Sequence, residues 1–200
     1  MHEMNQGNGM QIRPMEPGDF IAFWPIFRDI VAARETYAFD PDMDQEAARR
    51  LWCEAPLETW LAEEDGQLLG SYFLKANAAG PGGHVGNCGY MVAPAARGKG
   101  VARMMCEHSQ QRARERGFLA LQFNSVVATN AAAVALWQKL GFDVVGRLPR
   151  AYRHPAHGLV DCLVMYKWLG EAEKLAMPEP VKLIGRKNIE ATVLRRRKRD

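Results

Sequence analysis

Apolar residues recur along the chain at spacings that alternate between the period of a strand and that of a helix. Phe20, Phe23, Trp24 and Phe27 stand at i, i+3, i+4 and i+7, which predicts a helix that buries an aromatic face. The Asp-Gly pair at 65–66 separates two apolar runs and is a common hairpin turn, so two antiparallel strands are expected around it. The pattern as a whole predicts an α/β fold, a mixed central sheet with helices on both faces.

The expected elements follow the order β-α-α-β-β-β-α-β-α-β-β. The strands are expected at 10–15, 58–63, 68–75, 87–92, 118–123, 142–148 and 159–166. The helices are expected after Asp19 and at 44–53, 98–116 and 130–140. The glycines and proline at 80–83 predict a loop, and so do the prolines around His154 and His157. His108 falls on the apolar face of a helix and is expected to pack there.

Charge places a boundary near residue 170. Residues 170–200 carry nine Lys/Arg and five Asp/Glu, a net charge of +4, whereas residues 1–169 carry 17 and 18, a net charge of −1. The apolar content of 48% is enough for a buried core. We therefore expect one domain over residues 1–169 and a basic tail over residues 170–200, with a short ordered piece at 181–184. Nucleic-acid binding is not expected outside the tail.

Neither a targeting signal nor a metal site is visible. The N-terminus has no cationic stretch followed by an apolar run, and the two long uncharged stretches, 76–96 and 118–138, are too rich in Gly, Pro or polar residues to cross a membrane. His154 and His157 lack a third ligand. The four cysteines have no paired spacing, and they are Cys53, Cys88, Cys106 and Cys162. We expect a cytoplasmic protein without a metal, and a homodimer is one oligomeric state that we consider.

The turn after Val92 carries the clearest chemistry. A strand that ends there enters a turn containing Gly98 and Gly100, from which a helix begins. Free backbone N–H groups converge in such a turn and the helix dipole adds positive charge, so it can hold a pyrophosphate. The glycines let the backbone approach the anion, and Arg97 and Lys99 add positive charge. Two glycines by themselves would more simply indicate a tight turn.

Two ordered motifs resemble those of the GNAT N-acetyltransferase superfamily. They are Arg97-x-x-Gly100-x-Ala102, similar to its acyl-CoA-binding motif, and Asn130-x-x-Ala133-x-x-Leu136-Trp137-x-x-x-Gly141-Phe142, similar to its second motif. The resemblance covers residues 10–168. It implies acetyl-CoA as co-substrate, with the pantetheine arm in a gap between two splayed central strands. The residues so implied in binding it are Val92, Arg97, Gly98, Lys99, Gly100, Val101, Ala102 and Asn130. Asn130 can also cap its helix.

The resemblance leaves the proton transfers unassigned. Members of the superfamily often use a Glu and a Tyr where this chain has Asn87 and Trp137, and neither of these side chains can transfer the proton. Asn124, expected at the end of its strand, and Asn87 could orient the acceptor and donate to the oxyanion, or could simply satisfy splayed strand ends. Asp161 is a candidate base or acceptor ligand, with a structural role equally open. His84 is a weaker candidate base.

A second resemblance narrows the chemical class of the acceptor. Three segments are similar to the fungal L-azetidine-2-carboxylate acetyltransferases, which acetylate a cyclic imino acid: residues 80–85, 122–127 and 148–155. This implies a small amino acid-like acceptor whose carboxylate is bound by Arg150, Tyr152 and Arg153, although loop arginines can also be simply solvated. A protein or peptide amine is the alternative acceptor. A CoA-binding module with a nucleic-acid-binding tail is the alternative without catalysis.

Overall fold

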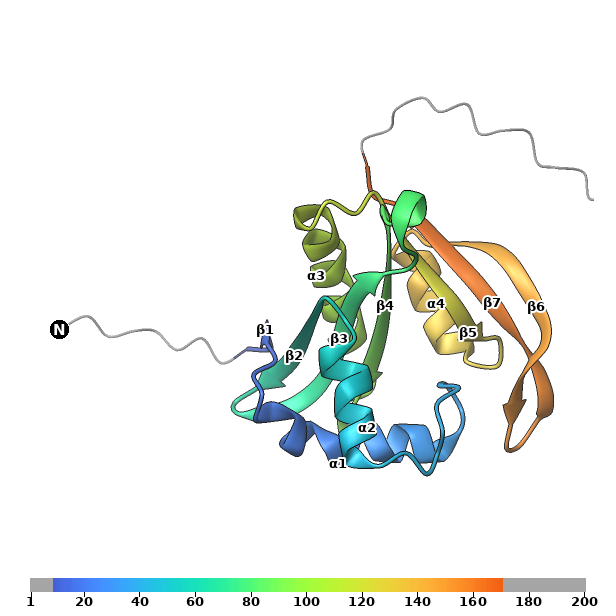
Figure 1. Ribbon diagram of the computed structural model, residues 1–200. Coiled ribbons are helices and arrows are strands. Elements are labelled where there is room, and N and C mark those ends of the chain that lie inside the picture. Colours follow the sequence, from blue (N-terminus) through green and yellow to red (C-terminus); the bar gives the residue numbers. More distant parts are fainter. Residues whose placement is uncertain (1–8, 171–200) are drawn as a thin grey trace, which may run out of the picture. The chain divides into compact units, whose positions relative to one another are not determined.

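The structure is a computed structural model that describes residues 9–170 (Figure 1). The expected tail lies outside the described residues from residue 171 on, and so does the ordered piece expected at 181–184. The strands are β1 (Gln11–Pro14), β2 (Glu58–Glu64), β3 (Gln67–Ala76), β4 (Val85–Val92), β5 (Ala120–Val127), β6 (Asp143–His154) and β7 (Gly158–Trp168). The helices are α1 (Asp19–Ala33), α2 (Gln45–Arg49), α3 (Val101–Glu115) and α4 (Ala131–Lys139).

All seven strands form one mixed sheet. Their order is β1-β2-β3-β4-β5-β7-β6, in which β4 and β5 run parallel and the other neighbours run antiparallel. One buried cluster joins the sheet to α3 and α4, and a second joins it to α1 and to the π-helical turn that follows α2. The α/β fold class with helices on both faces is therefore confirmed.

Local sequence signals are confirmed where they are strongest. Phe20, Phe23 and Phe27 are almost completely buried, as the spacing in α1 predicts, and the last two pack against Trp52. The turn between β2 and β3 has the positive φ angles, 50° and 76°, that its Asp-Gly pair favours. His108 packs as expected, with its Nδ1 2.6 Å from the Tyr72 hydroxyl.

Several predicted boundaries are wrong. The helix expected from residue 98 begins at Val101, because Gly98 and Gly100 have φ angles of +78° and +86°, which an α-helix does not contain. The strand expected to end at residue 123 continues to Val127. The loop expected around His154 is in large part strand β6, which reaches His154 itself.

Strand β6 contains a wide bulge. Leu148 pairs with Cys162 and Tyr152 pairs with Val160, so residues 149–151 lie opposite Asp161 alone. Arg150 within the bulge has a positive φ of 53°. The Asp161 carboxylate accepts a hydrogen bond from the Arg150 backbone N–H at 2.9 Å and from Arg147 at 2.8 Å. Asp161 therefore holds the bulge in place.

The cysteines are unpaired, as their spacing predicts. Cys88, Cys106 and Cys162 are buried, whereas Cys53 is half-buried. Within residues 9–170, no helix is both long enough and apolar enough to cross a membrane. The same part of the chain contains no group of three His, Cys, Asp or Glu side chains arranged to hold a metal ion.

Candidate active site

Strands β4 and β5 separate soon after they begin. They pair only where Val85 lies opposite Ala120 and Gly86 lies opposite Leu121, and beyond that point they diverge (Figure 1). The buried Asn87 bridges the start of the gap, because its Nδ2 donates to the Gln122 backbone carbonyl at 2.8 Å. Asn87 thus replaces a missing ladder bond, which is the structural role the sequence left open, and its side chain also lines the cavity described below.

A β-bulge interrupts the pairing of β5 with β7, on the edge of β5 that faces away from the gap. Phe123 pairs with Met165 and Val126 pairs with Leu163, so Asn124 and Ser125 of β5 lie opposite a single residue of β7. Bulges turn side chains away from the regular alternation and are frequent beside active sites. The expectation that Asn124 lies at the end of its strand is therefore wrong. It lies at a bulge in the middle of β5.

Asn124 belongs to a chain of side-chain amides. Gln122 Nε2 donates to Asn124 Oδ1 at 2.8 Å, and Asn124 Nδ2 donates to Asn77 Oδ1 at 2.7 Å. An amide nitrogen carries two hydrogens, so one N–H of Asn124 has no partner in the described part of the chain. The residue is exposed and lines the cavity. It can therefore donate one further hydrogen bond to a ligand.

The glycine-rich turn forms a site for an anion. Both Gly98 and Gly100 adopt left-handed φ angles, and a Cβ on either would meet no atom within 4 Å. Helix α3 follows with no side-chain cap and no acidic residue in its first turn. Its first N–H groups are thus available, and the helix dipole favours negative charge beside them.

One cavity of about 1030 Å³ connects this turn with the gap between the strands. The expected CoA-binding residues that line it are Val92, Arg97, Gly98, Gly100, Val101, Ala102 and Asn130, whereas Lys99 is not part of the lining. Asn130 also caps α4, since its side chain accepts from the Ala133 N–H at 3.2 Å. The motif residues therefore meet in one place even though they come from separate elements.

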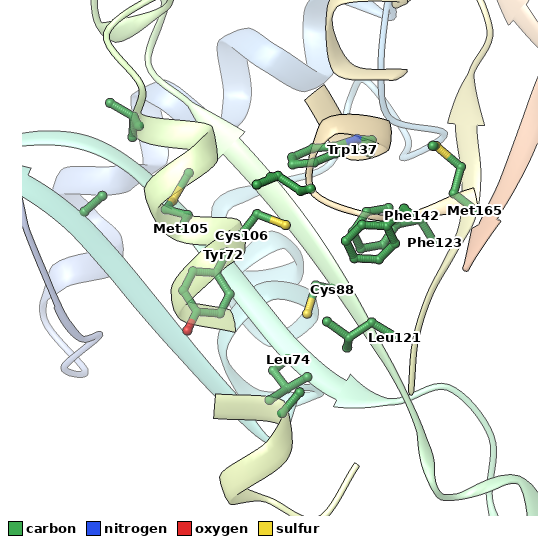
Figure 2. Packing of buried hydrophobic residues seen from close by; sticks show 14 of the residues in the cluster. Tyr72, Leu74, Cys88, Met105, Cys106, Leu121, Phe123, Trp137, Phe142 and Met165 are labelled. Atoms are coloured by element: carbon green, nitrogen blue, oxygen red, sulfur yellow. The ribbon is translucent and has the colours of Figure 1, made fainter. Parts of the chain in front are cut away.

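Trp137 of α4 serves as packing. Its ring centroid lies 5.0 Å from that of Tyr90 and 5.4 Å from that of Phe123, which in turn stacks on Phe142 (Figure 2). The tryptophan is 8% exposed.

Two tyrosines that line the cavity, Tyr37 and Tyr152, are joined by hydrogen bonds between distant parts of the chain. The Tyr37 hydroxyl donates to the Tyr90 carbonyl at 2.8 Å, and the Tyr152 hydroxyl donates to the Tyr37 carbonyl at 3.0 Å. These contacts join the segment after α1 to β4 and β6. Burial raises the pKa of Tyr37 and of Tyr90 above the ordinary value, so both remain protonated donors near neutral pH.

Of the other predicted site residues, Tyr152 lines the cavity, whereas Arg150, Arg153 and Asp161 are not part of the lining. Asp161 instead accepts hydrogen bonds from the Arg150 N–H and from Arg147 at the bulge in β6.

The remaining histidines divide in the same way. His154 and His157, expected in a loop without a third metal ligand, both line the cavity with their ring centroids 4.6 Å apart. His84 is not part of the lining, and its ring nitrogen lies 3.1 Å from the Pro81 carbonyl.

Comparison with known proteins identifies relatives of this chain. A family model described as the acetyltransferase (GNAT) family matches residues 24–142. N-acetyltransferase aca1 of Schizosaccharomyces pombe is 36% identical over 98 residues, which make up 48% of this chain and 47% of that protein. The aligned region thus spans about half of that curated relative.

Two solved structures resemble the chain over most of its length. A GCN5-related N-acetyltransferase from Kribbella flavida is 47% identical, with a TM-score of 0.76 over 80% of this chain and 97% of that one. The acetyltransferase yncA from Salmonella typhimurium, solved with its cofactor acetyl-CoA, is 25% identical, with a TM-score of 0.73 over 83% of this chain and 97% of that one.

Proposed function

Because the chain belongs to the acetyltransferase (GNAT) family, we propose that it transfers the acetyl group of acetyl-CoA to the amine of a small, amino acid-like acceptor. The observation that carries this proposal is the cavity that joins an uncapped, glycine-rich helix start to the gap between β4 and β5. A ligand with phosphates at one end and a thioester at the other matches such a cavity. A cyclic imino acid is the acceptor we would test first.

The residues that would hold acetyl-CoA follow from the same cavity. The N–H groups of Gly98, Gly100, Val101 and Ala102 would bind the pyrophosphate, with positive charge from Arg97 nearby. The backbone of Val92 would pair with the pantetheine arm in the gap, and Asn130 would contact the arm further along. Acetyl-CoA supplies the activated thioester.

The side chains at the gap would assist the transfer without taking a proton. The neutral acceptor nitrogen forms a bond to the carbonyl carbon and the carbon–sulfur bond breaks. The acylated nitrogen then loses a proton to solvent, and the departing sulfur takes one up from solvent, so CoA leaves as its thiol. The N–H of Asn124 that has no partner within residues 9–170 would stabilise negative charge on the carbonyl oxygen. Asn87 would hold β4 and β5 together at the point where the gap begins, through its hydrogen bond to the Gln122 carbonyl. The acceptor ammonium would lose its proton to solvent.

The proposal is tested by incubating the protein with acetyl-CoA and a panel of amines while thiol release is followed. The panel contains azetidine-2-carboxylate, proline, an alanine-initiated peptide and a polyamine, and mass spectrometry identifies the products. We expect release that depends on an amino acid. Release with the peptide alone would select the alternative acceptor. Acetyl-CoA binding without release for any amine would select a binding module.

The pH dependence of the rate distinguishes solvent from a protein base. With no protein base, kcat/KM rises with pH as the acceptor ammonium deprotonates, and its inflection follows the pKa of the acceptor when two acceptors are compared. An inflection that stays fixed for both acceptors would contradict this expectation. Its loss in His157→Gln or in Asp161→Asn would then identify the base.

The proposal includes a cytoplasmic location and a homodimer. Light scattering on the purified protein measures the oligomeric state.

The nucleic-acid-binding alternative concerns the basic tail. If the domain over residues 1–169 carries the activity, truncation of the chain after residue 194 should leave turnover unchanged.

A further inference from the structure

Lys75 lies beside the point where the gap between β4 and β5 begins. It stands directly opposite Asn87 in the antiparallel pairing of β3 with β4. Residues opposed in this way project to the same face of a sheet, with Cβ atoms about 4.5–5.5 Å apart. Asn87 in turn reaches β5 through its hydrogen bond to Gln122. Lys75, Asn87 and Asn124 all line the same cavity.

The Lys75 ammonium is positioned but has no counter-ion in residues 9–170. Its Nζ lies 5.4 Å from the centroid of the Phe73 ring. Phe73 is itself 7% exposed and packs edge-on against Trp52 at 4.9 Å, so this support is rigid. Glu35 lines the same cavity but forms no ion pair with Lys75. A cation held this way in a cavity wall is ready to bind an anion from solution.

The other cations of the cavity belong to its opposite end. Arg97 and Arg103 lie at the glycine-rich turn, beyond the end of β4. From Asn87 to Val92 the strand rises five residues, about 17 Å at the usual spacing of 3.3 Å per residue. Lys75 is therefore too far along the strand to serve the pyrophosphate.

We propose that Lys75 binds the carboxylate of an amino acid acceptor and so selects acceptors that carry one. This inference rests on the proposed function and names the residue that sets its substrate class. It replaces the two arginines of β6 that the sequence suggested for this role, since neither lines the cavity. The same charge disfavours polyamines, because it repels a second ammonium group.

Lys75→Met tests the proposal, because it keeps the length of the side chain and removes its charge. Acceptors are compared in matched pairs, an amino acid and its carboxamide. We expect the KM for the amino acid to rise about 10- to 100-fold, the usual effect of losing a charge-assisted hydrogen bond. The KM for the carboxamide, the KM for acetyl-CoA and kcat should change little. Lys75→Arg should retain most of the preference, and the exposed Lys139→Met should change nothing.

Two outcomes would overturn the role of Lys75. One is an equal effect of Lys75→Met on the amino acid and its carboxamide, and the other is a wild-type preference for the carboxamide. Calorimetric titration of the amino acid into the protein with CoA separates this inference from the proposed function. Binding that is lost in Lys75→Met, without turnover in the wild type, would support Lys75 and reject the transferase. Absence of binding would reject Lys75.

Discussion

Replacing Asn124 with alanine is expected to lower kcat by about 10²–10³-fold, the usual cost of removing one oxyanion donor. The Kd for acetyl-CoA should stay close to that of the wild type, because the pyrophosphate site lies in a different part of the cavity. Asn124 is exposed at a bulge, so the fold does not depend on it. Stopped-flow turnover and calorimetric titration of CoA measure the two quantities separately.

Two companion variants sharpen this prediction. Asn124→Asp keeps the shape of the side chain but removes its N–H groups, so it should lose as much activity as the alanine variant. Trp137→Phe keeps the aromatic packing against Tyr90 and Phe123 and should have a mild effect. A large loss of kcat in Trp137→Phe, with normal kcat in Asn124→Ala, would reverse the assignment of roles.

Gly100→Val is expected to weaken acetyl-CoA binding at least about 10- to 100-fold, through the loss of charge-assisted hydrogen bonds to the pyrophosphate. The added side chain projects into open space where the anion would lie. The left-handed φ of +86° also disfavours a β-branched residue and shifts the local backbone. Calorimetry with CoA on the folded variant provides the measurement.

Two controls separate blockade from backbone strain. Gly117 has a φ of +81° with no atom near its Cβ position, and it lies at the other end of α3, so Gly117→Val carries the same strain without touching the site. It should bind CoA normally. Gly100→Asn tolerates the left-handed conformation and tests the side chain alone. Equal CoA affinity in Gly100→Val and the wild type would remove the pyrophosphate from this turn.

The glycine-rich turn could be predicted from the sequence because its chemistry is local. Gly98 and Gly100 are close in the chain, and the features that matter, left-handed backbone and a following helix, depend on neighbouring residues. The same holds for the cap at Asn130 and the packing face of α4. Short-range signals of this kind can be read from the sequence because they do not depend on tertiary contacts.

The cavity wall formed by Tyr37, Lys75 and Tyr152 could not be predicted, because it depends on contacts between distant residues. Tyr152 and Tyr37 are 115 residues apart, and Tyr37 and Tyr90 are 53 residues apart. The position of Lys75 beside the gap follows only from the register that places it opposite Asn87. The bulge at Asn124 likewise follows from pairing with β7, and no short-range pattern marks it.

Strand β6 shows how composition can mislead about local structure. Pro149 and the charged residues around it have the composition of a loop, yet an edge strand tolerates proline. Asp161 was expected as a carboxylate within the sheet, and it is one. Its hydrogen bonds with the Arg150 N–H and Arg147 account for the structural role that the sequence left open.

The bulge in β6 also bears on how the protein avoids aggregation. β6 is the last strand of the sheet, and a regular edge strand would offer a continuous row of N–H and C=O groups to another molecule. Pro149 removes one donor, and the three residues opposite Asp161 break the spacing of the others. A strand from a second molecule therefore cannot extend the sheet along the full length of β6.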